Sequence, residues 1–152
     1  MPHIHELYDF AVSIFVVYKD KVLLVHHPRY QKWLNVGGHV ELDEDPEQTI
    51  YREVAEETGL KVRLLTDKPA YEDSTVKALP TPNYMDSHEA NAPHRHIGLV
   101  YFCVAENNNA QLSDEHLDMR WLSDADLDAP EYHLSESLKF YAREALKLAN
   151  KH

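Results

Sequence analysis

The sequence predicts one α/β or α+β domain with a mixed sheet covered by helices. Strand and helix patterns alternate along the 152 residues without strict βαβ regularity, and 43% of the residues are hydrophobic, enough to bury a core. The chain shows no internal repeat and no linker-like segment. Residues 1–152 are therefore expected to form a single domain.

The first half of the chain is expected to begin with a β-hairpin. Residues 9–18 are rich in β-branched and aromatic side chains, and residues 21–25 continue in the same way after a short polar break. A short strand over residues 33–36 then runs into Gly37-Gly38. Glycine is used where the backbone must approach another group closely, so this stretch is a candidate for function.

A helix is predicted from Pro46 to Thr58. Asp45 is placed as its N-cap, and Gln48 is placed to complete a capping box. Gly59 follows as the left-handed residue that ends the helix.

The second half of the chain mixes strands with a long irregular stretch. Residues 66–93 hold four of the eight prolines and show no sustained periodicity, so they are expected to form a loop with a functional role. The other predicted elements are strands over residues 60–65, 96–104 and 117–122, a short helix over 123–127, and an amphipathic helix over 134–149.

The overall charge limits the partners of the chain. Fifteen basic residues against twenty-six acidic ones give −11, which argues against a general nucleic-acid binder. The most apolar run, residues 10–18, is much shorter than the ~20 residues that span a bilayer. A single cysteine, Cys103, excludes an intramolecular disulfide and a four-cysteine zinc site. The expectation is a soluble, cytoplasmic protein without a membrane partner.

Most of the charge lies in one segment. Residues 41–57 hold eight acids and one base, Arg52, which makes −7 of the −11. On the predicted helix Glu53, Glu56 and Glu57 share a face about 100° wide, and Arg52 stands one turn before Glu56, where it can form an ion pair. Three carboxylates on one face repel one another unless a cation lies between them, and Mg²⁺ or Mn²⁺ with oxygen ligands meets that need.

The arc of the predicted helix next to the carboxylate face, from roughly 60° to 160°, supplies its buried stripe. The stripe consists of Ile50, Tyr51, Val54 and Thr58.

The segment from Gly38 to Leu60 resembles the Nudix box. The run Gly38-x5-Glu44-x7-Arg52-Glu53-Val54-Ala55-Glu56-Glu57-Thr58-Gly59-Leu60 matches the pattern G-x5-E-x7-R-E-U-x-E-E-x-G-U, in which U is apolar, at every specified position. The resemblance implies an α/β/α sandwich with a mixed sheet and a loop–helix–loop motif that binds divalent metal. It also implies hydrolysis of a nucleoside diphosphate linked to another moiety, by water attack on phosphorus. On this interpretation residues 66–93 are the specificity loop.

The resemblance also implies roles for individual residues. The implied metal ligands are three glutamate side chains and one backbone carbonyl, those of Glu53, Glu56, Glu57 and Gly38. Arg52 would orient the glutamates, and Glu44 would brace the loop or hold a metal ion through water. The partner is a small phosphoanhydride, and the pattern leaves open whether the chain is a monomer or a homodimer.

Several assignments stay open at this level. The catalytic base is Glu53 or an acid outside the box, with Glu115 first and Glu89 second. The candidate substrate contacts are three aromatic residues and one cation, Trp33, Tyr30, Tyr84 and Arg95. His94 and His96 share a strand face, but the sequence offers no third soft ligand that would make them a transition-metal site.

Two other functions compete with hydrolysis. A nucleotide-binding sensor could keep the fold without turnover, since fold does not fix function. The complete set of box glutamates and the lack of an output domain within 152 residues argue against it. An acidic Ca²⁺-binding or structural domain is the other alternative, but the chain lacks the EF-hand loop pattern.

Overall fold

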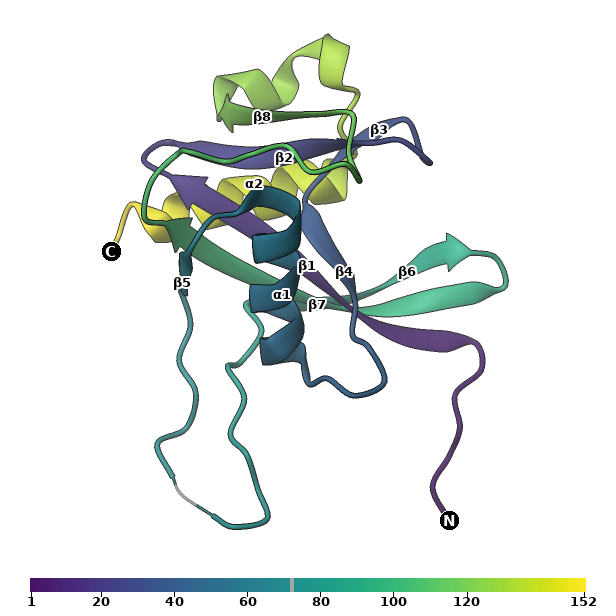
Figure 1. Cartoon of the computed structure of the whole chain (residues 1–152). Coiled ribbons are helices and arrows are strands. Elements are labelled where there is room, and N and C mark those ends of the chain that lie inside the picture. Colours follow the sequence, from purple (N-terminus) through teal and green to yellow (C-terminus); the bar gives the residue numbers. More distant parts are fainter. Residues whose placement is uncertain (72) are drawn as a thin grey trace.

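The computed structural model describes residues 1–71 and 73–152 and contains an eight-stranded mixed sheet with a helix on each face (Figure 1). The strands are β1 (Tyr8–Tyr18), β2 (Lys21–His27), β3 (Lys32–Leu34), β4 (Val36–His39), β5 (Val62–Leu64), β6 (Tyr84–Asn91), β7 (His94–Ala105) and β8 (Asp118–Ser123). The helices are α1 (Pro46–Thr58), α2 (Glu136–Ala149) and two 3₁₀ turns, η1 (Ala125–Asp128) and η2 (Pro130–Tyr132).

β1 is the organising strand of the sheet. It runs parallel to β7 from Tyr8 to Val17, which is nearly its whole length. On its other edge it pairs with β4 through residues 11–14 and with β2 only through Val17 and Tyr18. β7 also pairs with β6 and β5, and β2 also pairs with β3 and β8. The Gly37-Gly38 segment is thereby held directly against the middle of the sheet.

The two helices cover opposite faces of this sheet, α1 in front and α2 behind in the view of Figure 1. Alternate side chains of β1 point to opposite faces. Ile14 belongs to the core cluster that includes Ile50 of α1, and Phe15 belongs to the one that includes Ala142 of α2. The predicted α/β fold with a helix-covered mixed sheet is confirmed.

Helix α1 has the predicted bounds, Pro46–Thr58. Gln48 N–H donates to Asp45 Oδ1 at 3.0 Å, and Asp45 N–H donates to Gln48 Oε1 at 2.9 Å, which completes the capping box. Gly59 adopts φ 70°, ψ 6° and ends the helix. Tyr51 was wrongly placed in the buried stripe, because its side chain is 44% exposed. The buried face of α1 includes Glu53 and Glu57. It is therefore rotated away from Tyr51, which lies just outside its other edge.

The predicted irregular stretch is only partly irregular. Its last third forms β6, which pairs with β7 from Tyr84 opposite Val100 to Asn91 opposite His94. The preceding segment loops out beside α1 (Figure 1). Lys68 Nζ pairs with Glu47 at 3.2 Å in this region. Residue 72 belongs to the predicted specificity loop and lies outside the described residues.

The remaining elements follow the predictions with small shifts. α2 begins at Glu136 rather than at residue 134, because Ser135 caps it by accepting a hydrogen bond from Leu138 N–H. The short helix over 123–127 is the 3₁₀ turn η1, and the strand expected over 60–65 is the shorter β5. Within residues 1–71 and 73–152, no helix has the length and apolarity needed to cross a membrane.

Candidate active site

A cleft of about 550 Å³ opens where β4, α1 and the exposed surface of the sheet meet. Glu53 and Glu57 of α1 line it together with Gly37 and Gly38 of β4. The loop before β8 contributes Glu115 to the same cleft. The structure thus brings the glycine pair, two box glutamates and the first outside candidate for the base to one place.

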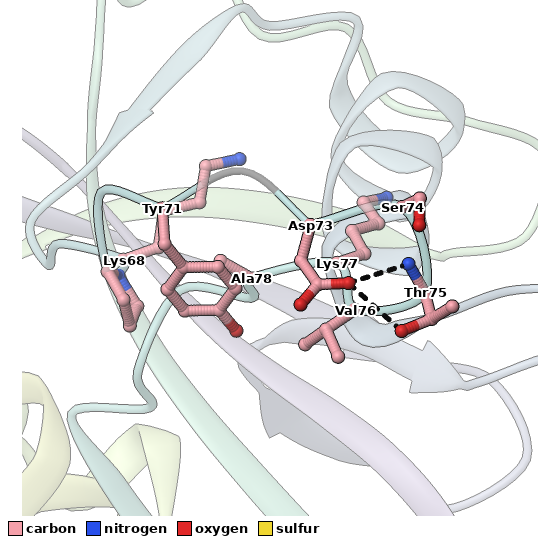
Figure 2. A pocket seen from close by; sticks show the side chains of 9 residues that line it. Lys68, Tyr71, Asp73, Ser74, Thr75, Val76, Lys77 and Ala78 are labelled. Atoms are coloured by element: carbon pink, nitrogen blue, oxygen red, sulfur yellow. Dashed lines mark hydrogen bonds between the residues drawn. The ribbon is translucent and has the colours of Figure 1, made fainter.

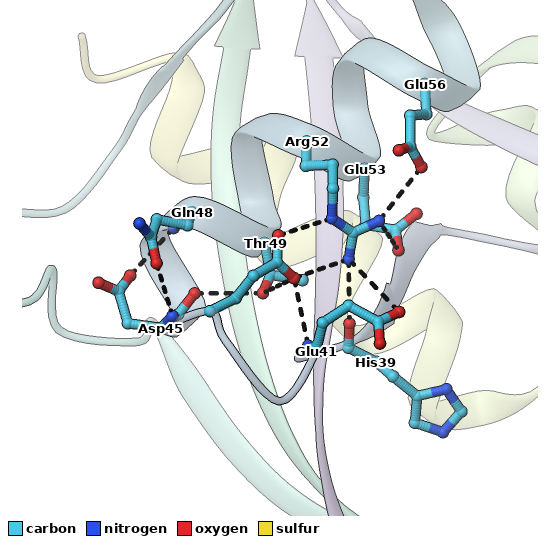
Figure 3. Close-up of polar contacts among 9 residues, drawn as sticks. His39, Glu41, Asp45, Gln48, Thr49, Arg52, Glu53 and Glu56 are labelled. Atoms are coloured by element: carbon cyan, nitrogen blue, oxygen red, sulfur yellow. Dashed lines mark hydrogen bonds and ion pairs between the residues drawn. The ribbon is translucent and has the colours of Figure 1, made fainter.

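Arg52 donates hydrogen bonds to several residues of the box (Figure 3). It donates to both oxygens of Glu44, at 2.6 and 2.9 Å, and to Glu53 Oε1 at 3.0 Å. It also donates to Glu56 Oε2 at 3.2 Å, the ion pair expected from their spacing, and to the backbone oxygen of His39 at 3.3 Å. The hydrogen bond from Arg52 lowers the pKa of Glu44 to about 2, and the same contact raises the pKa of Arg52. One guanidinium therefore fixes the positions of three carboxylates.

Glu44 has the contacts of a brace for the loop that precedes α1. Its Oε1 accepts from Glu41 N–H at 3.2 Å and from Thr49 Oγ1 at 3.1 Å, in addition to its pairing with Arg52. These bonds link the loop to the first turns of the helix. A role for Glu44 as a metal ligand through water stays a prediction.

Two of the glutamates are buried on the floor of the cleft. Glu53 is 8% exposed and Glu57 is 5% exposed. Burial raises the pKa of Glu53 to about 7 although Arg52 opposes the shift. Burial and then the Glu53 carboxylate raise the pKa of Glu57 to about 8, although Gly37 N–H donates to Glu57 Oε2 at 3.1 Å. Two neighbouring buried carboxylates resist ionisation together unless a cation compensates them, so this pair fits a divalent metal ion.

Gly37 and Gly38 lie where neighbouring atoms are too close to leave room for a side chain. A Cβ atom on Gly38 would collide with the Glu53 carboxylate, and one on Gly37 would collide with the backbone oxygen of Val12. Gly38 pairs with Val12 in the β1–β4 ladder. Only a residue without a side chain lets the backbone at this position lie so close to the box glutamates. This close approach is compatible with Gly38 as a contributor to a metal site.

His116 is a residue of the cleft that the sequence did not indicate. Its side chain is buried, and its Nε2 lies 3.5 Å from Glu57 Oε1. Its Nδ1 has no hydrogen-bond partner within residues 1–71 and 73–152. Burial and then the neighbouring His27 lower the pKa of His116. No local pattern marks it, because it meets Glu57 only through the folding of the loop before β8.

The two outside candidates for the base both line the cleft. Glu115 is exposed there, and its charge contributes to the raised pKa values of Glu53 and Glu57. Glu89 reaches the cleft from β6. Both therefore remain candidates by position.

The predicted aromatic contacts divide into one in the cleft and two away from it. Tyr30 lines the cleft and is 44% exposed. Tyr84 instead packs on the ring of Phe140 from α2 at a centroid distance of 5.4 Å. Trp33 packs on Tyr132 at 5.5 Å and contacts the core on the α2 side. Neither Tyr84 nor Trp33 is among the residues that line the cleft.

Arg95 is held by the strand beside it. It donates to Ser87 Oγ at 3.1 Å and to the Ser87 backbone oxygen at 3.0 Å, and it does not line the cleft. The structure therefore brings neither Arg95 nor Tyr84 to the box.

A second hollow, of about 500 Å³, lies within the loop before β6 (Figure 2). Several of its polar groups are already paired, either within the hollow or with the start of α1. Asp73 Oδ1 accepts from the backbone N–H and the hydroxyl of Thr75, both at 2.9 Å, and Lys77 pairs with Asp45 at 2.6 Å. No residue of the box lines this hollow, so the cleft beside α1 is the candidate site.

Comparison with known proteins gives the same family from three directions. The NUDIX domain model matches residues 7–143. A protein named probable DHNTP pyrophosphohydrolase from Lactococcus lactis subsp. cremoris is 29% identical over 81% of this chain and 70% of its own length. The nucleoside triphosphatase NudI of an Escherichia coli O139:H28 strain is 28% identical over 63% of this chain and 64% of its own length.

Solved structures agree. A hydrolase of the NUDIX family from Clostridium perfringens is 32% identical and superposes with a TM-score of 0.81, over 96% of this chain and 99% of that one. An Ap4A hydrolase from C. elegans shares the fold, with a TM-score of 0.70 at 17% identity over 95% of this chain and 99% of that one. With the complete box and a family model that spans most of its residues, the chain belongs to the Nudix hydrolase family.

Proposed function

We propose that the chain is a divalent-metal-dependent pyrophosphohydrolase that cleaves a nucleoside diphosphate linked to another moiety. The observation that carries this proposal is the buried pair Glu53 and Glu57, which share the floor of an open cleft with the glycine pair. Buried carboxylates side by side are costly for a protein that binds no cation. They are useful to one that must bring a cation and an anionic substrate together.

The ligands for Mg²⁺ or Mn²⁺ would be Glu53, Glu56, Glu57 and the backbone carbonyl of Gly38. When bound, the metal would offset the pyrophosphate charge, polarise a phosphorus–oxygen bond and lower the pKa of a water molecule. Arg52 holds the Glu53 and Glu56 side chains in place through the bonds described above. The fixed carboxylates would make the site ready before the substrate arrives.

The proton of the attacking water would pass to Glu53 or to Glu115. A variant pair separates the two: Glu53→Gln should weaken metal binding and turnover together, because this carboxylate is also a ligand. Glu115→Gln should lower kcat without weakening metal binding if Glu115 is the base. Calorimetry of Mn²⁺ binding beside steady-state kinetics reads both quantities.

The proposed substrate is a nucleotide or nucleotide-sugar type phosphoanhydride. The names of the sequence relatives point to triphosphate substrates, DHNTP in one case and nucleoside triphosphates in the other. Tyr30 at the cleft offers a ring on which a base could stack, a contact worth ~1–3 kcal/mol. The cleft otherwise carries many carboxylates, so substrate binding should depend strongly on metal ions.

A substrate panel tests the proposal. Nucleoside triphosphates, dinucleoside polyphosphates, ADP-ribose, nucleotide sugars and coenzyme A would be incubated with Mg²⁺ or Mn²⁺ and the products resolved by mass. Turnover of at least one substrate should be lost on addition of EDTA and in Glu56→Gln, while circular dichroism shows an unchanged fold. If Glu56→Gln cleaves the same substrates at the wild-type rate, the proposal is wrong.

A further inference from the structure

Three side chains that are not among the proposed box ligands converge beside the cleft. Asp9, His39 and His96 come from the neighbouring strands β1, β4 and β7, and their ligand atoms all lie within 4.8 Å of one another. The sheet register brings them together, because Asp9 is the partner of His96 and Ala11 is the partner of His39. The Nε2 atoms of His39 and His96 face each other at 2.8 Å. The structure thus supplies His96 with the partners that its own strand lacks.

A chain of hydrogen bonds sets the tautomer of His96. Tyr141 OH donates to Asp86 Oδ2 at 2.7 Å, and His88 Nδ1 lies 2.7 Å from Asp86 Oδ1. Since a carboxylate only accepts, His88 donates from Nδ1, and in the neutral ring its Nε2 is then an acceptor. His88 Nε2 lies 3.2 Å from His96 Nδ1, so His96 donates from Nδ1 and presents a lone pair at Nε2, toward His39. Metal-binding histidines are commonly oriented in this way, by an outer partner on the other ring nitrogen.

The sheet leaves room for this relay. A Cβ atom on Gly98 would lie 2.6 Å from Asp86 Oδ1 and 3.1 Å from His88 Cε1. Asp86 is the cross-strand partner of Gly98, and His88 is the partner of His96. The Asp86–His88 pair therefore occupies the space over β7 that a side chain at position 98 would fill.

We propose that His39 Nε2, His96 Nε2 and the Asp9 carboxylate bind a transition-metal ion of the Zn²⁺ class. Two imidazoles and one carboxylate suit Zn²⁺, whereas Mg²⁺ prefers the all-oxygen ligands of the box. Zn–N bonds of ~2.0–2.1 Å at a tetrahedral angle place two ligating nitrogens ~3.3 Å apart. His39 and His96 must separate slightly from 2.8 Å, which the exposed His39 side chain can do. His39 would then carry its proton on Nδ1.

The site would have an open fourth position at the cleft. His39, His88 and His96 line the same cleft as Glu53 and Glu57. Three protein ligands and one open position are typical of zinc that binds water or substrate, whereas structural zinc has four protein ligands. The ion would therefore offer an anionic ligand in the cleft a second contact, in addition to the metal ion proposed at the box glutamates. The site itself does not depend on the proposed hydrolytic function.

Zinc binding to the full-length chain tests this site. Isothermal titration with Zn²⁺ in excess Mg²⁺, which keeps the box supplied with its own ion, should give one Zn²⁺ per chain. His39→Gln and His96→Gln should each weaken this binding at least about tenfold, because even the loss of an outer partner of a ligand commonly costs that much. The matched control is His94→Gln, an exposed histidine on the same strand outside the cluster, which should bind Zn²⁺ as the wild type does.

Location of the ion completes the test. A crystal soaked in Zn²⁺ should show an anomalous peak between His39 and His96, and the peak should persist in Glu56→Gln. Because His39 is exposed, His39→Gln should fold even if His96→Gln does not, and circular dichroism checks both. Wild-type Zn²⁺ affinity in a folded His39→Gln variant, or a peak only at the box glutamates, would overturn the proposal. Absence of Zn²⁺ binding to the wild type would mean that the histidines serve only as a hydrogen-bonded pair.

Discussion

Replacing Glu57 with glutamine should make the metal-free protein more stable at mildly alkaline pH. Glu57 is 5% exposed, and burial raises its pKa to about 8 from an ordinary value of 4.5. In the folded state the carboxyl therefore holds its proton over a pH range in which the unfolded chain has released it. The stability associated with the protonated form is complete below pH 4.5 and is lost as the pH rises through about 8.

The size of the effect follows from the same two values. Each pH unit between them corresponds to ~1.4 kcal/mol, so full ionisation of Glu57 costs at most about 5 kcal/mol above pH 8. Water in the open cleft and small rearrangements recover part of this, and we expect ~1–3 kcal/mol. The glutamine oxygen can still accept the hydrogen bond from Gly37 N–H that Glu57 Oε2 accepts at 3.1 Å. For a chain of this size each kcal/mol raises Tm by about 2–4 °C.

Thermal unfolding followed by circular dichroism measures this effect. In EDTA the Tm of the wild type should fall between about pH 5 and about pH 8, and Mn²⁺ should restore it. Glu57→Gln should show a flatter pH dependence and lose the gain from Mn²⁺. Glu56→Gln is the matched control: its side chain is 47% exposed, so it should change the pH dependence in EDTA much less than Glu57→Gln does, and it should lose the Mn²⁺ gain. The same Tm and the same pH dependence for Glu57→Gln and the wild type in EDTA would show that burial does not raise the pKa of Glu57.

Three further variants probe the box and its surroundings. Gly38→Ala should weaken Mn²⁺ binding by about tenfold or more in calorimetry, because its Cβ would displace the Glu53 carboxylate; unchanged affinity would contradict this. Arg52→Lys keeps the charge but loses the two-pronged contact with Glu44, so kcat/KM should fall ~10–100-fold in steady-state kinetics. Tyr84→Ala should lower the free energy of unfolding in urea by ~2 kcal/mol and leave KM unchanged, since the ring packs on α2 away from the cleft; a higher KM at unchanged stability would restore Tyr84 as a substrate contact.

Local signals explain which parts of the fold could be predicted. The bounds of α1 follow from Asp45, Pro46 and Gly59, which act within one or two turns of chain. β6 was missed because its residues from Asp86 to Glu89 are polar. This strand is held in place by its pairing with β7. Its side chains alternate between partly buried and exposed, but they are polar, so the sequence shows no apolar alternation that would predict a strand.

In the candidate site, too, the parts set by local sequence could be predicted and the parts set by distant contacts could not. The box is continuous in sequence, so the ion pair between Arg52 and Glu56 could be predicted from helical spacing alone. His116 and the cluster around His96 depend on contacts between distant segments. His39 and His96 are 57 residues apart and meet only because β4 and β7 both pair with β1. Strand register of this kind is set by the whole sheet, and a single sequence does not reveal it.

In the proposed mechanism, metal held by the buried glutamates allows water to attack phosphorus in the cleft. Hydrolysis of the best panel substrate in ¹⁸O-labelled water with Mn²⁺, followed by mass spectrometry of the products, tests it most directly. One labelled oxygen should appear on a phosphate-containing product, and product formation should stop in EDTA. Unlabelled phosphate products, or hydrolysis that continues without metal, would contradict this mechanism.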